Sequence, residues 1–216
     1  MPQGTGGRER AGHLVKCLSP GMPLFHAIAG FFLFFELPIP IFWLIIHPFS
    51  SFWKHRVKAA FRIAAPFAWI SAGALLWAFR SNLLSPTPAS IPAVVAGSAL
   101  IGVEIYLFAG SEKELGGRRL VGLAELTGTG ELCTSGMYAH VRHPRYTGMF
   151  SAVLGAALLA GTAKLWLILA VWWVFALFVI LGLEERELAS RFGVGYLEYR
   201  KRVPPFLPFG IFKGSE

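Results

Sequence analysis

Long apolar segments alternate with short polar ones along most of the chain. Three of them, at about 23–48, 59–79 and 90–110, each have the ~20 mostly apolar residues that a membrane-spanning helix needs. Pro38 and Pro40 interrupt the first segment, and we expect a kink there because proline lacks the N–H of a continuous helix. The pattern therefore predicts three transmembrane helices in the first half of the chain.

The second half begins with a glycine-containing polar segment at 111–146 and continues with two apolar stretches, 147–160 and 165–183. Only residues 161–164 separate the stretches, which predicts an antiparallel helical hairpin. The first stretch is short, and we expect its helix to begin further back, at Pro144, because proline suits the first turn of a helix.

The apolar pattern predicts an all-α, polytopic integral membrane protein with about five transmembrane helices and a C-terminal hairpin. The polar segments beside that hairpin predict a cytosolic cofactor pocket. We divide the chain into three regions. Residues 1–22, with several glycines, are expected to be a flexible tail, and 23–110 to hold three transmembrane helices. Residues 111–216 are expected to form the catalytic region: a cytosolic loop, the transmembrane hairpin and an amphipathic C-terminal segment.

Composition and charge support a membrane protein. Hydrophobic residues make up 55% of the chain and charged residues 15%, whereas soluble domains carry about 25% charged residues. The net charge of +8 fits loops that face anionic lipid, and we expect no nucleic-acid partner. Cys17 and Cys133 have neither metal-ligand nor redox spacing, and we expect no metal site.

The lysines and arginines predict the orientation in the membrane. With five spans, 5 of them fall on the side of the N-terminus and 15 on the side of the C-terminus. The positive-inside rule places the second group, and with it the C-terminus, in the cytosol. If Pro38 and Pro40 break the first span into two re-entrant halves, the N-terminus returns to the cytosol and the other loops stay in place.

Two polar segments flank the predicted hairpin, and the hairpin brings them together on the cytosolic side. One covers residues 136–148, and the other begins at Glu184. We expect a pocket there with apolar walls below and polar groups above, which suits an amphiphile that meets a polar cofactor.

The first polar segment has a readable local structure. His143 precedes a proline and should be extended, which leaves free backbone N–H groups beside the N-terminus of the next helix. Such groups favour an anion or the edge of a purine ring. Arg142 offers a planar fork for a carboxylate, and Gly148 allows a close approach of a ligand or another backbone.

The second polar segment combines acids and tyrosines. Glu187 and Arg191 are an i,i+4 pair, which we expect to be a solvated surface pair. Tyr196 and Tyr199 share a helix face and either serve the site or anchor the helix at the membrane interface. We expect at least one of the adjacent acids Glu184 and Glu185 to be functional.

Three ionisable residues lie inside apolar segments: His26, Glu36 and Glu104. Intramembrane ionisable groups are functional candidates by default, but both glutamates could equally lie near a membrane face or pair with polar groups. A non-enzymatic membrane scaffold or transporter would find its best support in these three residues.

The two polar segments resemble a known family. The run Arg142-His-Pro-Arg-Tyr-Thr-Gly148, then a hairpin, then Glu184-Glu-x-x-Leu188, Phe192-Gly193, Tyr196 and Tyr199, is similar to the isoprenylcysteine carboxyl methyltransferases. That family is related to the membrane phospholipid methyltransferases. The resemblance covers about 136–209, and the first three spans match only in general character.

The resemblance implies a five-helix membrane fold, S-adenosylmethionine as methyl donor and a lipophilic acceptor that enters sideways from the bilayer. The reaction that it implies is methylation of the carboxylate of a prenylcysteine-like substrate. A phospholipid amine or a small thiol remains an alternative acceptor. The resemblance also implies ten site residues: Arg142, Glu184 and Glu185 as catalytic residues, and Tyr138, His143, Pro144, Tyr146, Gly148, Tyr196 and Tyr199 as cofactor-binding residues.

Individual roles follow as hypotheses. Arg142 would hold a carboxylate of the acceptor or of the methionine moiety. Glu184 or Glu185 would bind the ammonium or ribose hydroxyls of the cofactor, or would orient Arg142. His143 and Tyr146 would fix the adenosine. The nearest rival is an NADPH-dependent membrane reductase of the sterol reductase type, because such enzymes resemble this C-terminal architecture.

Overall fold

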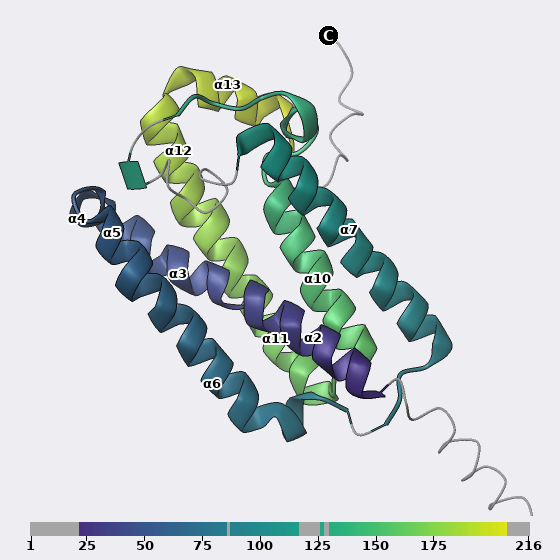
Figure 1. Ribbon diagram of the computed structural model, residues 1–216. Helices are drawn as coiled ribbons and strands as arrows, with labels where there is room; N and C mark the ends of the chain where they lie inside the picture. The colour runs from purple at the N-terminus through teal and green to yellow at the C-terminus, as the bar shows by residue number, and fades with distance from the viewer. Residues whose placement is uncertain (1–21, 86, 117–125, 128–129, 207–216) are drawn as a thin grey trace, which may run out of the picture.

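The computed structural model describes residues 22–85, 87–116, 126–127 and 130–206 (Figure 1). The predicted tail at 1–22 lies outside the described residues except for Met22. All regular elements of the described part are helical, as predicted. The bridge between Leu84 and Gly161 is the single β-type pairing recorded among these residues.

The first apolar segment is one kinked helix. Helix α2 (Met22–Glu36) ends in a turn at Leu37, and α3 (Pro38–Ile46) continues from Pro38 in the same general direction (Figure 1). The predicted kink is confirmed, and its cause is the missing N–H of the prolines. The alternative of two re-entrant halves is wrong, because α2 and α3 together run from one end of the molecule to the other.

A short connection follows the first helix, with η2 (His47–Phe49) and α4 (Ser50–Lys54). The second predicted helix then consists of α5 (Val57–Ala59), a π-helical turn η3 (Ala60–Ala64) and α6 (Ala65–Leu83). The wide turn comes just before Pro66, where a proline inside the helix would otherwise clash with the preceding turn.

The third helix, α7 (Ile91–Leu115), begins where the sequence predicts and ends five residues later than 110. Ser90 caps its N-terminus, since its hydroxyl accepts a hydrogen bond from the backbone N–H of Ala93. Gly116, with φ of 74°, ends the helix.

The predicted hairpin consists of α10 (Pro144–Ala160) and α11 (Ala163–Leu177). Thr162 lies in the tight turn and caps α11 by accepting a hydrogen bond from the backbone N–H of Leu165. Helix α10 begins at Pro144, as predicted. The start of α10 and the far end of α11 therefore lie at the same end of the molecule (Figure 1).

Helix α11 continues through a π-helical turn η5 (Phe178–Glu184) into α12 (Glu185–Phe192). Gly193, with φ of 57°, then turns the chain into α13 (Val194–Arg202), which crosses the end of the bundle (Figure 1). A non-glycine residue would be strained at this backbone angle. A short 3-10 helix, η4 (Gly136–Ala139), lies at the same end, before α10.

Helix α10 is the central element and packs against α2 and α7. At its crossing with α7, a Cβ atom on Gly97 would lie 2.9 Å from the carbonyl oxygen of Gly155, and one on Gly155 would lie 2.7 Å from that of Gly97. Small residues at such a crossing let two backbones approach closely, as membrane helices often do.

Four helical segments of the described chain are long and apolar enough to cross a membrane: Leu24–Phe49, Val57–Leu83, Ile91–Leu115 and Ala163–Phe192. Their outer faces carry large exposed apolar side chains such as Trp77 and Val174. Helix α10, with 17 residues, is at the short end of the range for a span, ~17–25 residues. The polytopic membrane fold is confirmed, and a fifth crossing by α10 remains a prediction.

Candidate functional site

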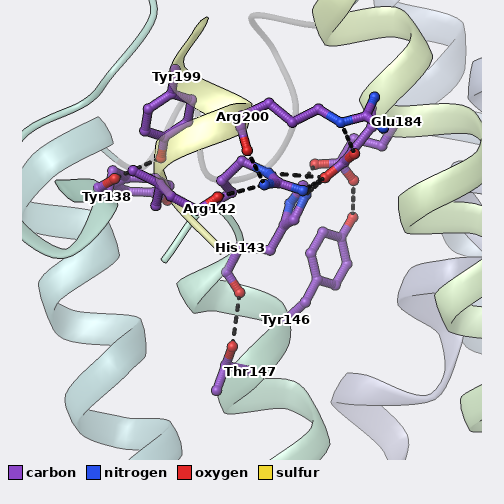
Figure 2. A network of polar contacts seen from close by, with 10 residues as sticks. Tyr138, Arg142, His143, Tyr146, Thr147, Glu184, Tyr199 and Arg200 are labelled. Atoms are coloured by element: carbon purple, nitrogen blue, oxygen red, sulfur yellow. Dashed lines mark hydrogen bonds and ion pairs between the residues drawn. The ribbon is translucent and has the colours of Figure 1, made fainter. Parts of the chain in front are cut away.

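Arg142 lies at the centre of a polar network (Figure 2), in which its main partner is Glu185. The guanidinium donates from Nε to Glu185 Oε1 over 3.0 Å and from Nη2 to the same oxygen. Its Nη1 donates to the carbonyl oxygens of Arg200 and Val203. The planar fork predicted to bind a ligand carboxylate is thus largely occupied by the protein itself.

His143 lies between two carboxylates in the same network. Its Nε2 is 3.2 Å from Glu185 Oε1, and its Nδ1 is 3.6 Å from Glu184 Oε1. The hydroxyl of Tyr146 donates to the other oxygen of Glu184 over 2.6 Å. The two sequence segments that flank the hairpin are therefore in direct contact, as the sequence predicts.

The electrostatics of His143 follow from this position. Burial lowers the pKa of the His143 imidazole, but its hydrogen bonds to Glu184 and Glu185 outweigh burial and raise the pKa above its usual value. Only the protonated ring carries a hydrogen on both nitrogens and can donate to both carboxylates.

The C-terminal segment after α13 closes one side of the network. The backbone N–H groups of Arg142 and His143 donate to the carbonyl oxygens of Pro204 and Pro205, each over 2.9 Å. Thr147 donates its hydroxyl hydrogen bond to Phe206 O over 2.9 Å. His143, with φ of −124° and ψ of 60°, lies outside the helical region as predicted, but it is not in the predicted extended conformation. The prediction of free N–H groups for a ligand is also wrong, because these carbonyls occupy them.

Three tyrosines lie beside this network. The Tyr199 hydroxyl donates to the backbone carbonyl of Tyr138 over 2.6 Å and joins α13 to η4. The Tyr196 hydroxyl is buried and has no hydrogen-bond partner among the described residues. Burial raises the pKa of Tyr196 and Tyr199, so both hydroxyls stay protonated at neutral pH.

A second buried network surrounds Arg145. Its Nη1 donates to Glu104 Oε1 over 2.7 Å, and its Nη2 donates to Glu36 Oε2 over 2.9 Å. Glu36 comes from the end of α2, Glu104 from the middle of α7, and Arg145 from the first turn of α10. The two intramembrane acids of unknown role thus share one cation.

Gly148 gives this second network its room. A Cβ atom at this position would collide with Glu104 Oε2, and it would lie 3.4 Å from Leu107 Cβ. The predicted close approach at Gly148 therefore involves the Glu104 side chain of α7. His26, the third ionisable residue in an apolar segment, lies elsewhere and bonds the carbonyl of Ser85 over 2.9 Å.

A cavity of about 970 Å³ connects the two networks. Its walls near the end of the bundle carry polar side chains of both networks, and its other walls carry aromatic and aliphatic side chains from α2, α3, α6 and α7. Seven of the ten predicted site residues line it: Tyr138, Arg142, His143, Tyr146, Glu184, Tyr196 and Tyr199.

The other three predicted residues do not line the cavity as the described residues define it. Pro144 is the first residue of α10, and Gly148 leaves space for the Glu104 side chain. Glu185 binds Arg142, which lines the cavity, but does not line it itself. The predicted pair of Glu187 and Arg191 is present at 3.7 Å, but it is mostly buried, so its interpretation as a solvated pair is wrong.

Neither Arg145 nor His47 is among the site residues predicted from the sequence. Both line the cavity, and His47 stacks on Trp43 with 4.9 Å between ring centroids. Arg145 could have been found, since acids in apolar segments need a cation and Arg145 stands in the motif itself. Nothing in the sequence around His47 distinguishes it from an interfacial residue.

Residues 92–194, from α7 to the start of α13, match the family model described as phospholipid methyltransferase. This segment is a phospholipid methyltransferase-type domain. It contains the motifs of both polar segments up to Gly193 and supplies Glu104 and Arg145 as well. The family predicted from the sequence is confirmed.

Several curated proteins are similar to the chain. Protein-S-isoprenylcysteine O-methyltransferase of Schizosaccharomyces pombe is 42% identical over 79 residues, which are 36% of this chain and 33% of that protein. The human protein of the same name is 40% identical over 90 residues, 39% of this chain and 30% of that protein. Methanethiol S-methyltransferase 1 of Bradyrhizobium diazoefficiens is 38% identical over 73 residues, 34% of this chain and 25% of that protein.

The matches span about a third or less of the length of these relatives. No solved structure matches the chain significantly.

Proposed function

We propose that the protein is an S-adenosylmethionine-dependent methyltransferase of the membrane that acts on a lipophilic acceptor. One observation carries the proposal: a single cavity has polar walls from the matched segment and aromatic walls from the apolar helices. Such a cavity suits a polar donor and an apolar acceptor that meet inside it.

The polar walls fit the methyl donor. The buried Tyr196 hydroxyl lacks a partner among the described residues, and a ligand hydroxyl or carboxylate would satisfy it. Glu184 lines the cavity as an acceptor for an ammonium or ribose hydroxyls, and His143, Tyr146 and Tyr138 provide ring surfaces beside it. When bound, the donor supplies an electrophilic methyl group on a sulfonium.

The side chains then act mainly by positioning and by excluding water, which together are worth up to ~7–11 kcal/mol in favourable cases. Arg142 is a positioning residue in this proposal, because Glu185 and two backbone carbonyls hold its guanidinium. Through Pro204 and Val203 it fixes the C-terminal segment against the start of α10.

The acceptor has two candidate classes. The carboxylate of a prenylcysteine-like substrate is supported by the isoprenylcysteine O-methyltransferases among the relatives. A thiol is supported by the methanethiol S-methyltransferase and by the two acids Glu36 and Glu104, which share the single cation of Arg145 on the cavity wall. The distribution of 5 against 15 lysines and arginines supports a cytosolic face for the site and the C-terminus.

A binding titration tests the donor. The full chain in detergent should bind S-adenosylmethionine and not NADPH, and it should transfer label from the donor to at least one of three acceptors: a prenylcysteine, a long-chain thiol and phosphatidylethanolamine. Tyr196→Phe should weaken donor binding, whereas Tyr106→Phe, on the exposed face of α7, should not. Binding of NADPH without S-adenosylmethionine would replace the proposal with the reductase alternative.

A further inference from the structure

The network of Arg145, Glu36 and Glu104 has more acid than base. One guanidinium meets two carboxyl groups, and the two acids also interact with each other. The side chains of Glu36 and Glu104 are only 5% and 4% exposed. With both acids ionised, one negative charge remains without compensation inside this network.

An uncompensated buried charge is costly, because it has lost its hydration and gained no partner. The ionised network would therefore gain stability by taking up a proton from an acceptor bound beside it. The proton would bind to Glu104 Oε2, since this buried oxygen has no hydrogen-bond partner among the described residues. The same excess of negative charge opposes an anionic group, such as a carboxylate acceptor, at this wall.

The network faces the cavity at its apolar side. All three residues line the cavity together with aromatic side chains of α2 and α7, including Phe31, Phe35 and Phe108. These aromatic walls suit the hydrocarbon part of an acceptor, which would bring its reactive group to the acids.

We propose that Glu104, supported by Glu36 and Arg145, accepts the proton of a lipophilic thiol whose sulfur is then methylated. This inference rests on the proposed function and names its acceptor class. A thiol enters an apolar cavity as a neutral molecule, since its pKa is ~8.5. An alkyl amine, with a pKa of ~10.4, would enter as an ammonium with no free lone pair for the reaction.

The step is balanced. The acceptor sulfur forms a bond to the methyl carbon while the bond from that carbon to the sulfonium breaks, and the electron pair of the broken bond stays on the departing sulfur. The proton of the thiol passes to the Glu104 carboxylate. Both products, the methylated acceptor and the demethylated donor, are neutral thioethers. The proton on Glu104 must return to solvent before the next cycle.

The test compares two thiols in the full chain in detergent. With a long-chain alkyl thiol, Glu104→Gln should reduce the rate by about 100-fold, because a general base typically contributes 10²–10⁴-fold. With an aryl thiol that is already ionised at neutral pH, the same variant should lose less than about 10-fold, because no proton has to be removed. The exposed Glu198→Gln on α13 is the matched control and should leave both rates unchanged.

A second measurement follows the proton itself. When the chain loaded with S-adenosylmethionine is mixed with the long-chain thiol, infrared difference spectra should show a protonated carboxyl band that appears during a single turnover, is missing in Glu104→Gln and is present in Glu198→Gln. Equal losses with both thiols, no loss with either, or transfer to prenylcysteine alone would overturn the inference while S-adenosylmethionine binding still upheld the proposed function. Failure to bind S-adenosylmethionine would remove both.

Discussion

Arg142 and Arg145 stand three residues apart at the start of α10, and their surroundings differ in charge and in partners. Arg142 shares Glu185 with Arg200, whose Nε lies 3.5 Å from Glu185 Oε2. Two backbone carbonyls are further acceptors for Arg142. Arg145 binds two carboxylates and lies 5.1 Å from the ring of Phe108. The first network balances its acids with bases, and the second does not.

The difference separates two tasks that one cavity has to perform. A balanced network keeps its geometry through the reaction and can hold a polar donor in place. A network with an excess carboxylate changes its protonation easily and suits the reacting side of the acceptor. Mutations that alter the balance on either side of α10 should therefore have different consequences.

The largest effect is expected for stability, from Arg145→Ala. This change leaves Glu36 and Glu104 buried without their cation, which should cost about 3–5 kcal/mol of the free energy of unfolding. Thermal unfolding in detergent measures it. The variant in which Arg145→Met is combined with Glu36→Gln and Glu104→Gln should recover most of the loss, because it removes the charges together. An Arg145→Ala protein as stable as the wild type would refute the proposed charge imbalance.

Arg142→Ala should have its main effect on activity. We expect methyl transfer to fall by about 100-fold, since the variant loses the contacts that fix Glu185 and the segment after α13. Arg142→Lys should recover little, because an ammonium cannot form the same fork. Arg200→Ala is the matched comparison: its side chain is 51% exposed, so the reduction should stay below about 5-fold. Near wild-type transfer in Arg142→Ala would remove the positioning role.

Gly148→Ala tests the space that the acidic network needs. The new methyl group would meet Glu104 Oε2, and we expect a loss of about 1–3 kcal/mol in the free energy of unfolding. Gly102→Ala on α7, the helix that carries Glu104, is the control: a Cβ atom there meets no atom within 4 Å, so the change should be neutral or stabilising by up to ~1 kcal/mol. Equal stability of the two variants would mean that α7 and α10 are not in close contact at Gly148.

The sequence predicted the parts of the fold that depend on local chemistry. Apolar runs, Pro38, Pro144 and the short turn at Gly161 fixed the helices, the kink and the hairpin, because each acts within a few residues. The partners of Arg142 and Arg145 could not be predicted in the same way. Glu36 lies 109 positions from Arg145, and only the packing of α2 and α7 on α10 shows which arginine it meets.

The same limit explains the error at His143. The sequence correctly predicted a non-helical residue before Pro144, but no local rule shows that residues 204–205 return to occupy the N–H groups. The resemblance identified seven residues that line the cavity, whereas it could not distinguish them from Pro144, Gly148 and Glu185, which support the walls. A sequence motif of this kind includes residues that face a ligand and also residues that keep those side chains in position.

The smallest expected effect is a change in the pH dependence of stability through His143. Because its pKa in the folded protein is raised, protonated His143 stabilises the fold fully below ~6.5, and this contribution is lost as the pH rises through the raised pKa. The melting temperature should therefore fall across that range in the wild type and fall less in His143→Gln, which cannot gain or lose the charge. His55→Gln, at an exposed position, should keep the wild-type slope. A wild-type slope in His143→Gln would mean that Glu184 and Glu185 do not hold a proton on this ring.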